Sequence, residues 1–238
     1  MKMELSPEVF ELAPGFRRAV VIARDIDNEG RSEELELRLT IAMARFREKY
    51  TRENFRQTPK LAIWDEIFRK MSVNPNKFPP SITNLAKRTL AGNEIAFISK
   101  VVAIMNIVSL ETVLPLGGDD LASVTGDLRL GPAVGNETYR PQGRPDETES
   151  PRPGEIVYLD TGSAEVLCRA WCWKNGHTTR IRDETTRVAL NIDCADGQIA
   201  EDLPAVVATV SSLLEHHCGA RIETHVLDRD HPAVTIDL

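Results

Sequence analysis

The stretch Val101–Leu121 is the feature that most constrains how this chain can fold. Its first half is a long apolar run, hydrophobic on all sides, which is typical of a helix buried in a core rather than one on a surface. Pro115 and the segment Gly117–Asp120 then interrupt the pattern, and residues of these types predict a turn. A glycine-rich backbone at the end of a buried helix can approach a ligand closely, because no side chain stands in the way.

Asn106 is the one amide within this apolar run. Its position predicts that the side chain faces the interior, where an amide without hydrogen-bond partners costs roughly 1–3 kcal/mol. Two interpretations are open. The side chain either pins the turn that follows the helix or points into a ligand pocket.

Apolar spacing along the rest of the chain predicts further helices and a set of short strands. The predicted helices cover 31–50, 59–71, 82–90 with Ser81 as its cap, and 199–217 with Pro204 in its first turn and Gly219 just past its end. The predicted strands cover 9–12, 19–23, 127–130, 155–160, 165–170, 188–194, 221–227 and 233–236. The pair Asn175-Gly176 predicts a tight turn, and the Gly- and Pro-rich segment 131–154 predicts an exposed loop.

The composition is ordinary for a globular protein, with 42% hydrophobic and 27% charged residues. No repeat or linker divides the 238 residues, so we expect a single domain over 1–238. No apolar run reaches the roughly 18 residues that a membrane span needs. The acidic N-terminal segment also lacks the apolar core of a signal peptide, so we expect a cytoplasmic protein that does not contact the membrane.

The four cysteines are too few and too scattered to form a disulfide framework. Cys168, Cys172, Cys194 and His177 offer metal-ligating atoms, but their spacing matches no common zinc pattern. The apolar surroundings of Cys168 and Cys172 favour thiols packed in the core. We therefore expect no metal site.

The formal net charge of −7 argues, weakly, against a protein that holds nucleic acid by broad electrostatics. One segment differs from this average. Between Arg169 and Arg187, five basic side chains stand against two acidic ones, a local balance of +3. This patch is suited to a phosphate backbone, although an ordinary solvated hairpin face would have a similar composition.

The motif N-x-V-S-L-x-x-x-L-P-L-G-G-x-D-L, which begins at Asn106, resembles the signature of the B3/B4 domain, the editing domain of the phenylalanyl-tRNA synthetase beta chain. It is especially similar to the free-standing versions of that domain. The block W-D-E-I-F-R-K-M-x-V-N-P-N-K-F-P-P-S-I, which begins at Trp64, adds to the resemblance. The similarity covers roughly residues 58–219. It implies an α+β fold, with B3/B4-like mixed and antiparallel sheets, packed helices and a helical N-terminal part.

Three positions depart from the pattern of the synthetase-borne domain. Gly117 stands where that domain has a His that lines the editing pocket, and Met105 stands where it has a Thr. His177 falls at or next to a Glu that helps to choose the amino acid, although a lone His in a turn is more often an exposed bystander. The resemblance therefore implies an amino-acid preference other than the tyrosine that the synthetase domain removes.

The implied activity is hydrolysis, in trans, of the ester that joins a wrong amino acid to tRNA. No phosphate-binding loop, dinucleotide fingerprint or class II synthetase motif is recognisable, so we expect no aminoacylation and no cofactor. An activated ester can be hydrolysed by positioning a water and polarising the carbonyl, and Asn106, Gly117 and Gly118 are the candidates for this role.

The remaining candidates would bind the substrate. Those expected to contact the aminoacyl end are Met105, Leu116, Asp119, Asp120, Asn175, Gly176 and His177. Those expected to contact the tRNA backbone are Lys174, Arg180 and Arg182. Asp119 and Asp120 would also serve as caps of a following short helix. The expected partner is tRNA, not DNA. The alternative function is a non-catalytic module of the same fold that binds tRNA or a small amino-acid-like ligand.

Overall fold

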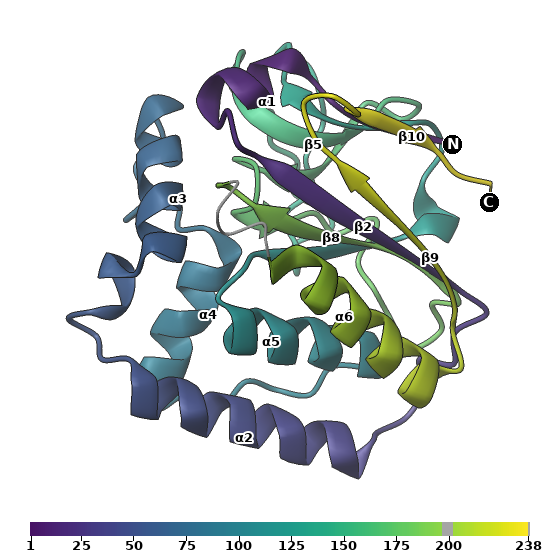
Figure 1. The fold of residues 1–238 in the computed structure, drawn as a ribbon. Coiled ribbons are helices and arrows are strands. Elements are labelled where there is room, and N and C mark those ends of the chain that lie inside the picture. Colours follow the sequence, from purple (N-terminus) through teal and green to yellow (C-terminus); the bar gives the residue numbers. More distant parts are fainter. Residues whose placement is uncertain (197–201, 238) are drawn as a thin grey trace.

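Strand β2 (Arg17–Arg24) lies at the centre of the architecture because apolar residues occupy both of its faces. In this computed structural model, which describes residues 1–196 and 202–237, β2 lies between β8 (Arg187–Cys194) and β9 (Arg221–Leu227) (Figure 1). Strand β3 (Leu116–Asp120) pairs with the far side of β8. The resulting four-stranded sheet, β3-β8-β2-β9, is antiparallel throughout, and β3 is an edge strand.

A second sheet of six strands has the order β10-β1-β4-β5-β6-β7. These strands are β1 (Lys2–Leu5), β4 (Leu128–Pro132), β5 (Ile156–Asp160), β6 (Glu165–Arg169), β7 (Lys174–Asn175) and β10 (Ala233–Thr235). Only β1 and β4 are parallel to each other, so this sheet is mixed. The predicted α+β class, with mixed and antiparallel sheets and packed helices, is confirmed.

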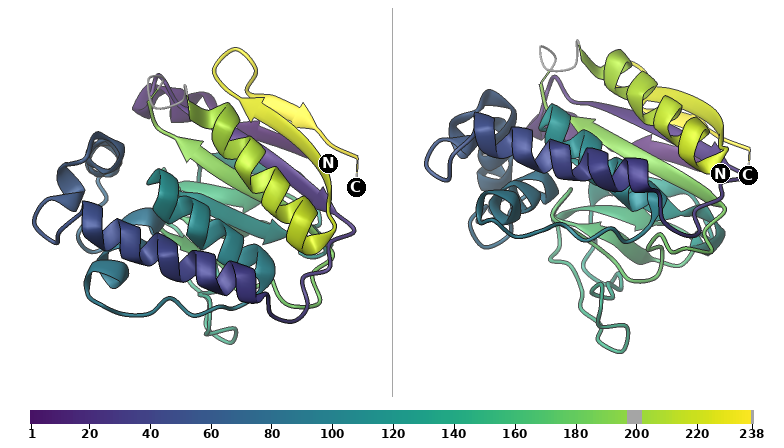
Figure 2. Two further views of the ribbon diagram at one scale, coloured as in Figure 1. Left: turned by 60° about the horizontal axis from the view of Figure 1, so that its bottom comes forward. Right: turned by 90° about the horizontal axis from the view of Figure 1, so that it is seen from below.

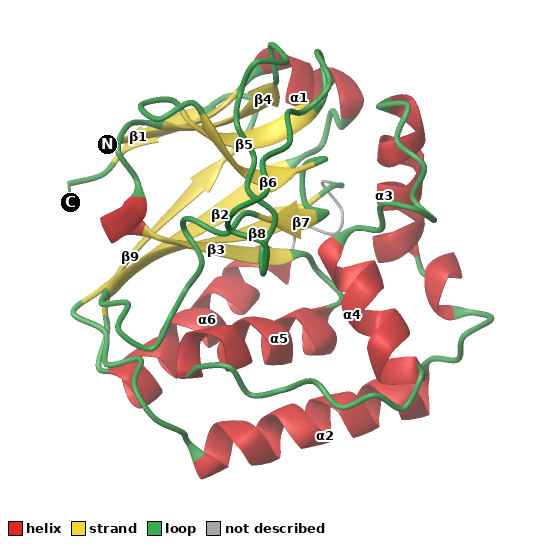
Figure 3. Ribbon diagram, turned by 180° about the vertical axis from the view of Figure 1, so that it is seen from behind, coloured by secondary structure: helices red, strands yellow, loops and turns green. Residues whose placement is uncertain are grey.

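Helices cover the face of the four-stranded sheet that points away from the six-stranded one (Figures 2 and 3). Helices α5 (Lys100–Thr112) and α6 (Leu203–Cys218) lie next to the sheet, and α2 (Glu33–Lys49) packs on α5. Helices α3 (Pro59–Lys70) and α4 (Ser81–Leu90) stand at one end, and α1 (Pro7–Leu12) packs near β4. Two short 3-10 turns, Phe55–Gln57 and Leu121–Ser123, complete the described elements. No described helix is long and apolar enough to cross a membrane.

The alternation of side chains along β2 builds two cores. Val21 packs with α2, α5 and α6 in the helix-side core, whereas Val20 and Ile22 belong to the core between the sheets. The aromatic side chains Phe16, Trp64 and Trp171 meet edge to face in the core between the sheets. Because both faces of the four-stranded sheet are covered, residues at its β3 edge lie at the border of both cores.

Several local predictions were wrong, and the structure gives a reason for each. Residues 9–12 belong to helix α1, because Pro7 occupies its first turn. Ser81 is the first residue of α4 and does not cap it with its side chain. The loop 131–154 is not exposed throughout, since Tyr139 is buried against Val157 and Val166.

The two predicted turns beside the candidate site are strands. Segment Gly117–Asp120 belongs to β3, and the chain reverses earlier, at Val113, whose φ of 60° is left-handed. Ser109 supports this reversal by donating its hydroxyl to the Leu114 carbonyl at 2.6 Å. Asn175 ends β7, and the reversal between β6 and β7 lies at Ala170 and Trp171, both with positive φ.

Of the remaining expectations, the helices at 31–50 and 59–71 and the strands after residue 127 are confirmed within a few residues. The predicted helix 199–217 is observed from Leu203, with Pro204 in its first turn and left-handed Gly219 as its cap. Its predicted beginning, 199–201, lies outside the described residues.

Candidate functional site

Two adjoining cavities open along the edge of β3. The inter-sheet cavity, of about 200 Å³, lies between the two sheets and is lined by Arg18, Ser81, Pro115, Leu116, Gly117, Gly118, Asp119, Gln142, Tyr158, Cys168, Trp171, Cys172, Asn175, Asn191 and Asp193. The helix-side cavity, of about 240 Å³, is lined by Leu85, Arg88, Ile95, Ala96, Ile98, Val102, Met105, Asn106, Gly118, Gln142, Asn175, Arg180 and Ile181. Gly118, Gln142 and Asn175 line both, so the cavities meet at these residues.

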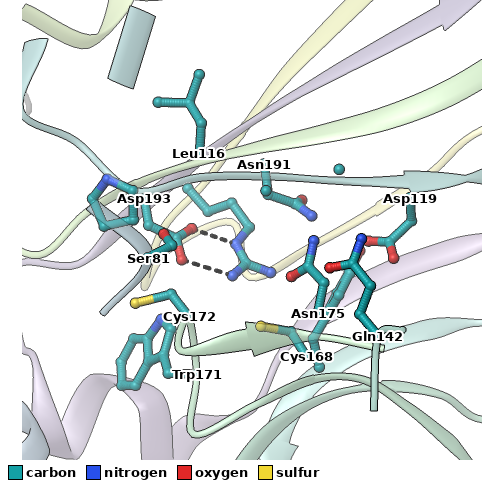
Figure 4. A pocket seen from close by; sticks show the side chains of 15 residues that line it. Ser81, Leu116, Asp119, Gln142, Cys168, Trp171, Cys172, Asn175, Asn191 and Asp193 are labelled. Carbon is teal, nitrogen blue, oxygen red and sulfur yellow. Dashed lines mark hydrogen bonds and ion pairs between the residues drawn. The ribbon is translucent and has the colours of Figure 1, made fainter. Parts of the chain in front are cut away.

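A buried ion pair forms one wall of the inter-sheet cavity. Arg18 donates from Nε to Asp193 Oδ1 at 2.7 Å and from Nη2 to Oδ2 at 2.9 Å (Figure 4). The two residues are opposite each other on β2 and β8, and each is only 3% exposed. The guanidinium also lies 5.0 Å from the centre of the Tyr158 ring. Two-point pairing of this kind fixes the direction of the guanidinium and leaves its third nitrogen, Nη1, free.

Four residues that line this cavity each have a buried polar side-chain atom without a hydrogen-bond partner among the described residues. These atoms are Arg18 Nη1, the Tyr158 hydroxyl, Asn191 Oδ1 and Trp171 Nε1. An unpartnered buried polar group ordinarily costs about 1–3 kcal/mol, so native proteins rarely keep one without a reason. Four around one cavity indicate a site whose polar groups are completed by a ligand or by water.

Asp119 contributes a titratable group to the same cavity. It accepts a 2.6 Å hydrogen bond from the Thr179 hydroxyl and is 4% exposed. Burial raises the pKa of Asp119 from its usual value to about 7, and this exceeds the opposing effects of the Thr179 bond and of Arg18. A carboxyl with this pKa exchanges protons readily at neutral pH.

Some backbone N–H and carbonyl groups of β3 point away from β8, toward the cavities at the open edge of the sheet. The Pro115 carbonyl accepts from Asp193 N–H on β8 at 3.1 Å, whereas Asp120 N–H points the other way, to the Thr179 carbonyl at 2.8 Å. Since backbone groups alternate along a strand, Gly117 pairs with β8 and Gly118 directs its N–H and carbonyl to the open edge. Gly118 is thus a backbone donor and acceptor at the junction of the two cavities.

The two glycines of β3 differ in what surrounds them. A Cβ atom on Gly117 would meet nothing within 4 Å, whereas one on Gly118 would lie 2.5 Å from Leu190 Cδ2 and 2.9 Å from Ile181 Cδ1. The missing side chain of Gly117 therefore leaves room in the inter-sheet cavity. That of Gly118 permits close packing on the helix side, beside Met105.

Asn106 projects from α5 into the helix-side cavity. It is half-buried, and its amide has no hydrogen bond to any described residue. The turn after α5 is held by Ser109 instead. Between the two interpretations of Asn106, the structure therefore favours the amide that points into a pocket.

Apart from Arg18, the residues that line the two cavities lie in a segment that matches one known protein family. A family profile described as the B3/4 domain matches residues 63–206, more than half of the chain, including α4, α5, β3 and most of the strands that line both cavities. The chain belongs to the B3/4 domain family. No curated protein matches it.

Among solved structures, this B3/4 domain protein is similar to an N-terminal fragment of the phenylalanyl-tRNA synthetase beta-subunit from Pyrococcus horikoshii. The two share 10% sequence identity, with a TM-score of 0.44. The similarity covers 92% of this chain and 49% of the fragment, so the chain spans about half the length of that structure.

The structure brings most of the sequence-predicted residues of this B3/4 domain together. Those that line one or both cavities are Met105, Asn106, Leu116, Gly117, Gly118, Asp119, Asn175 and Arg180. Asn175 lines the inter-sheet cavity together with Gln142 and Asn191 (Figure 4). The motif after Asn106 and the distant Asn175 thus converge on one cleft.

Other predicted residues lie away from the cavities. Asp120 is buried, accepts from the Thr185 hydroxyl at 3.0 Å and caps the 3-10 turn after β3, which is the structural alternative for this residue. Gly176 packs against the backbone of β6. His177 lines neither cavity, and its backbone N–H donates to the Arg140 carbonyl at 2.9 Å. Burial and the nearby Arg180 lower the pKa of His177.

The predicted basic patch is less positive than its number of basic residues suggests, because two of its arginines are paired with carboxylates. Arg169 binds both Glu155 and Glu149, each at 2.8 Å, and Arg182 pairs with Glu184 at 3.2 Å. Lys174 and Arg180 have no carboxylate partner among the described residues, and only Arg180 lines a cavity. Arg88 of α4 adds a second cation to the helix-side cavity.

Sequence reasoning missed the polar wall between the sheets. Arg18, Asn191 and Asp193 lie in strands that read as ordinary core segments, and Gln142 lies in the Gly- and Pro-rich loop. The available signal was charge inside apolar strands: Arg18 and Asp193 interrupt otherwise buried runs. Their pairing across β2 and β8 was not readable, because it depends on the register.

The four cysteines are all buried and free, in agreement with the predicted core thiols. Cys168 and Cys172 line the inter-sheet cavity, and burial raises the pKa of both thiols, which disfavours the nucleophilic thiolate. Within the described ranges, the only group of three side chains able to hold a metal is Glu34, His216 and His217 on the far side of the helices.

Proposed function

We propose that this B3/4 domain protein hydrolyses, in trans and in the cytoplasm, the ester that joins a wrong amino acid to the 3′ end of a tRNA. The observation that carries the proposal is the junction of the two cavities. Gly118 with its free backbone edge lies at this junction, the unpartnered amide of Asn106 lines the helix-side cavity, and the carboxyl of Asp119 lines the inter-sheet cavity. The ester would lie at this junction, with its amino acid in the inter-sheet cavity and its terminal nucleoside in the helix-side cavity.

The helix-side cavity has the surface that a terminal nucleoside needs. Ile98, Val102 and Ile181 supply apolar contact for a base. Arg88 and Arg180 supply positive charge for the adjoining phosphate. Two cations at the mouth of the cleft, rather than a broad basic surface, fit a protein whose net charge is −7.

The hydrolysis requires a donor for the carbonyl oxygen and a base for the water. Gly118 N–H and the Asn106 amide are the donors, and each such donor contributes about 10²–10³-fold in acyl-transfer enzymes. Asp119, whose pKa burial raises to about 7, would take the proton of the attacking water. Ester hydrolysis then splits the acyl–oxygen bond, with the proton passing to the departing ribose hydroxyl.

The second candidate is a binding module without hydrolysis. It is favoured by the glycine at position 117, which leaves the cleft without a histidine, and by the carboxylate pairing of Arg169 and Arg182. In this case the cleft would hold a small amino-acid-like ligand or a tRNA end without breaking a bond.

Release of radiolabelled amino acid from a panel of correctly and wrongly charged tRNAs separates the two functions. With enzyme well below substrate, the deacylase is expected to release the amino acid rapidly from one or a few mischarged pairs. The same assay with Asn106→Ala is the control for contaminating hydrolases. Release at the spontaneous rate from every pair would exclude the deacylase and leave the binding module.

A further inference from the structure

The four unpartnered atoms of the inter-sheet cavity define what it can bind. We propose that this cavity takes a carboxamide, the side-chain group of asparagine or glutamine, as the side chain of the ester-linked amino acid. The inference rests on the proposed function for the ester, but the identity of the bound group follows from the cavity itself. Each of Arg18, Tyr158, Trp171 and Asn191 is more than nine-tenths buried, and each has an unused polar atom.

The hydrogen-bonding capacities of these atoms favour one chemical group. Arg18 Nη1 and Trp171 Nε1 can only donate, Asn191 Oδ1 accepts, and the Tyr158 hydroxyl does either. A carboxamide has an oxygen with two lone pairs and a nitrogen with two hydrogens, so one planar group can serve all four atoms. With Asn191 Oδ1 as the unpartnered atom, Asn191 accepts from the nitrogen of the carboxamide.

Competing side chains leave polar atoms unserved. A carboxylate accepts but cannot donate, so Asn191 Oδ1 would stay unpaired. A phenol has one hydroxyl for four partners, and an aliphatic side chain has no polar atom at all. Sites built to hydrogen-bond a substrate reject analogues that lack the matching group, because buried polar atoms are then left without partners.

The charges around the cavity also disfavour an anion. Arg18 is its one cationic wall residue, and Asp193 already neutralises it through two hydrogen bonds. Asp119 adds a second carboxyl to the wall. The buried thiols of Cys168 and Cys172 are neutral. An anionic side chain would therefore meet two carboxyl groups and only one positive charge, whereas a neutral carboxamide adds no charge to a buried site.

A binding experiment with non-hydrolysable ligands tests the inference separately from catalysis. The probes are 3′-aminoacylamino-3′-deoxyadenosines, in which an amide replaces the ester, carrying asparagine, glutamine, aspartate, leucine or tyrosine. Isothermal titration of the full chain is expected to show the asparagine or glutamine probe binding at least about tenfold more tightly than the other three. Leucine and aspartate match asparagine in shape, so this difference reports hydrogen bonding rather than size.

Three variants test whether the preference arises in the cavity. Asn191→Leu removes an unpartnered acceptor and is expected to reduce the advantage of the carboxamide probes over the leucine probe at least about fivefold. Asn136→Leu makes the same change at a loop position outside the cavity and is expected to leave the ranking unchanged. Gly117→Val fills the cavity and is expected to weaken every probe.

Equal or tighter binding of the aspartate, leucine or tyrosine probe would overturn the inference, as would a lack of binding by both carboxamide probes. An unchanged ranking in Asn191→Leu would also contradict it. If the carboxamide probes bind selectively but no charged tRNA is hydrolysed, the inference stands and the deacylase function fails. If tRNAs carrying other amino acids are hydrolysed instead, the deacylase function stands and the inference fails.

Discussion

Gly117 on β3 is paired with Asn191 on β8, so the side chain that the glycine lacks would lie beside the Asn191 amide, on the face that lines the inter-sheet cavity. Cross-strand partners point to the same face of a sheet. This relationship explains how an edge strand can border a cavity between two covered sheets: the space over Asn191 is left open by a residue without a Cβ atom.

The two adjacent glycines should therefore respond oppositely to substitution. Gly117→Val places its side chain in open space, so we expect the midpoint of urea unfolding to change little while hydrolysis or ligand binding falls at least about tenfold. Gly118→Ala forces its methyl group against Leu190 and Ile181, and we expect it to lower the free energy of unfolding by about 1–3 kcal/mol. Equal destabilisation of both variants would contradict the placement of the cavity.

Asn106→Ala tests whether the amide acts on the substrate. Because no described residue binds this amide, we expect the free energy of unfolding to change by less than about 1 kcal/mol. We expect the hydrolysis rate under single-turnover conditions to fall about 10²–10³-fold, as when one carbonyl-binding donor is removed. A variant that unfolds would show instead that Asn106 is structural. Thr40→Ala, an exposed substitution on α2, the helix that packs on α5, controls for general effects on the helices.

Asp119 should make stability depend on pH in an unusual direction. Its folded-state pKa of about 7 lies above the usual 3.8, so the folded state holds this proton more tightly than the unfolded chain does. This contribution to stability is fully present below about pH 4, is lost as the pH rises to about 7, and stays absent above.

Asp119→Asn removes this dependence. The difference in unfolding free energy between variant and wild type should grow in favour of the variant by about 2–4 kcal/mol from pH 4 to pH 8. Urea titrations at several pH values measure it, and other carboxyl groups cancel in the comparison. If Asp119 is the base, hydrolysis by the wild type should also rise through about pH 7, and the variant should lack that rise. A constant difference in stability would exclude the raised pKa.

Removing one partner of the Arg18–Asp193 pair should destabilise the protein strongly, whereas replacing both partners by apolar residues should destabilise it much less. We expect Asp193→Asn or Arg18→Met alone to lower the free energy of unfolding by about 3–5 kcal/mol, because each leaves a buried polar partner uncompensated. The double variant Arg18→Met, Asp193→Leu should recover most of that stability but not ligand binding. A double-mutant cycle by urea denaturation measures the coupling, and additive effects would indicate that the two side chains do not interact.

Arg88 and Arg180 should govern the salt dependence of tRNA binding. Replacing both by Gln is expected to weaken tRNA binding and to reduce the slope of log affinity against log salt concentration, by about 0.7 for each single-strand phosphate that is no longer neutralised. Arg169→Gln and Arg182→Gln remove cations that are already paired with carboxylates, so they are expected to have smaller effects. The opposite order would place the tRNA on the hairpin rather than at the cleft.

Around the candidate site, the helix could be predicted from the sequence and the strand could not. The apolar run around Asn106 predicted a buried helix correctly, because a helix that is hydrophobic on all sides is stable only when it is buried in a core. The Gly117–Asp120 segment was predicted as a turn because glycine and aspartate favour turns, yet pairing with β8 holds it as a strand. Tertiary pairing outweighed the local preference of these residues.

The helices, most of the strands, the family motif and the residues around Asn106 could be predicted without coordinates, because they depend on apolar period or on residues close along the chain. Three relationships depend on the tertiary fold: Arg18 pairs with Asp193, Gly117 lies opposite Asn191, and four residues with unpartnered buried polar atoms line one cavity. The physical reason is register: a shift of one residue between strands turns every side chain to the other face, and no local pattern fixes that choice.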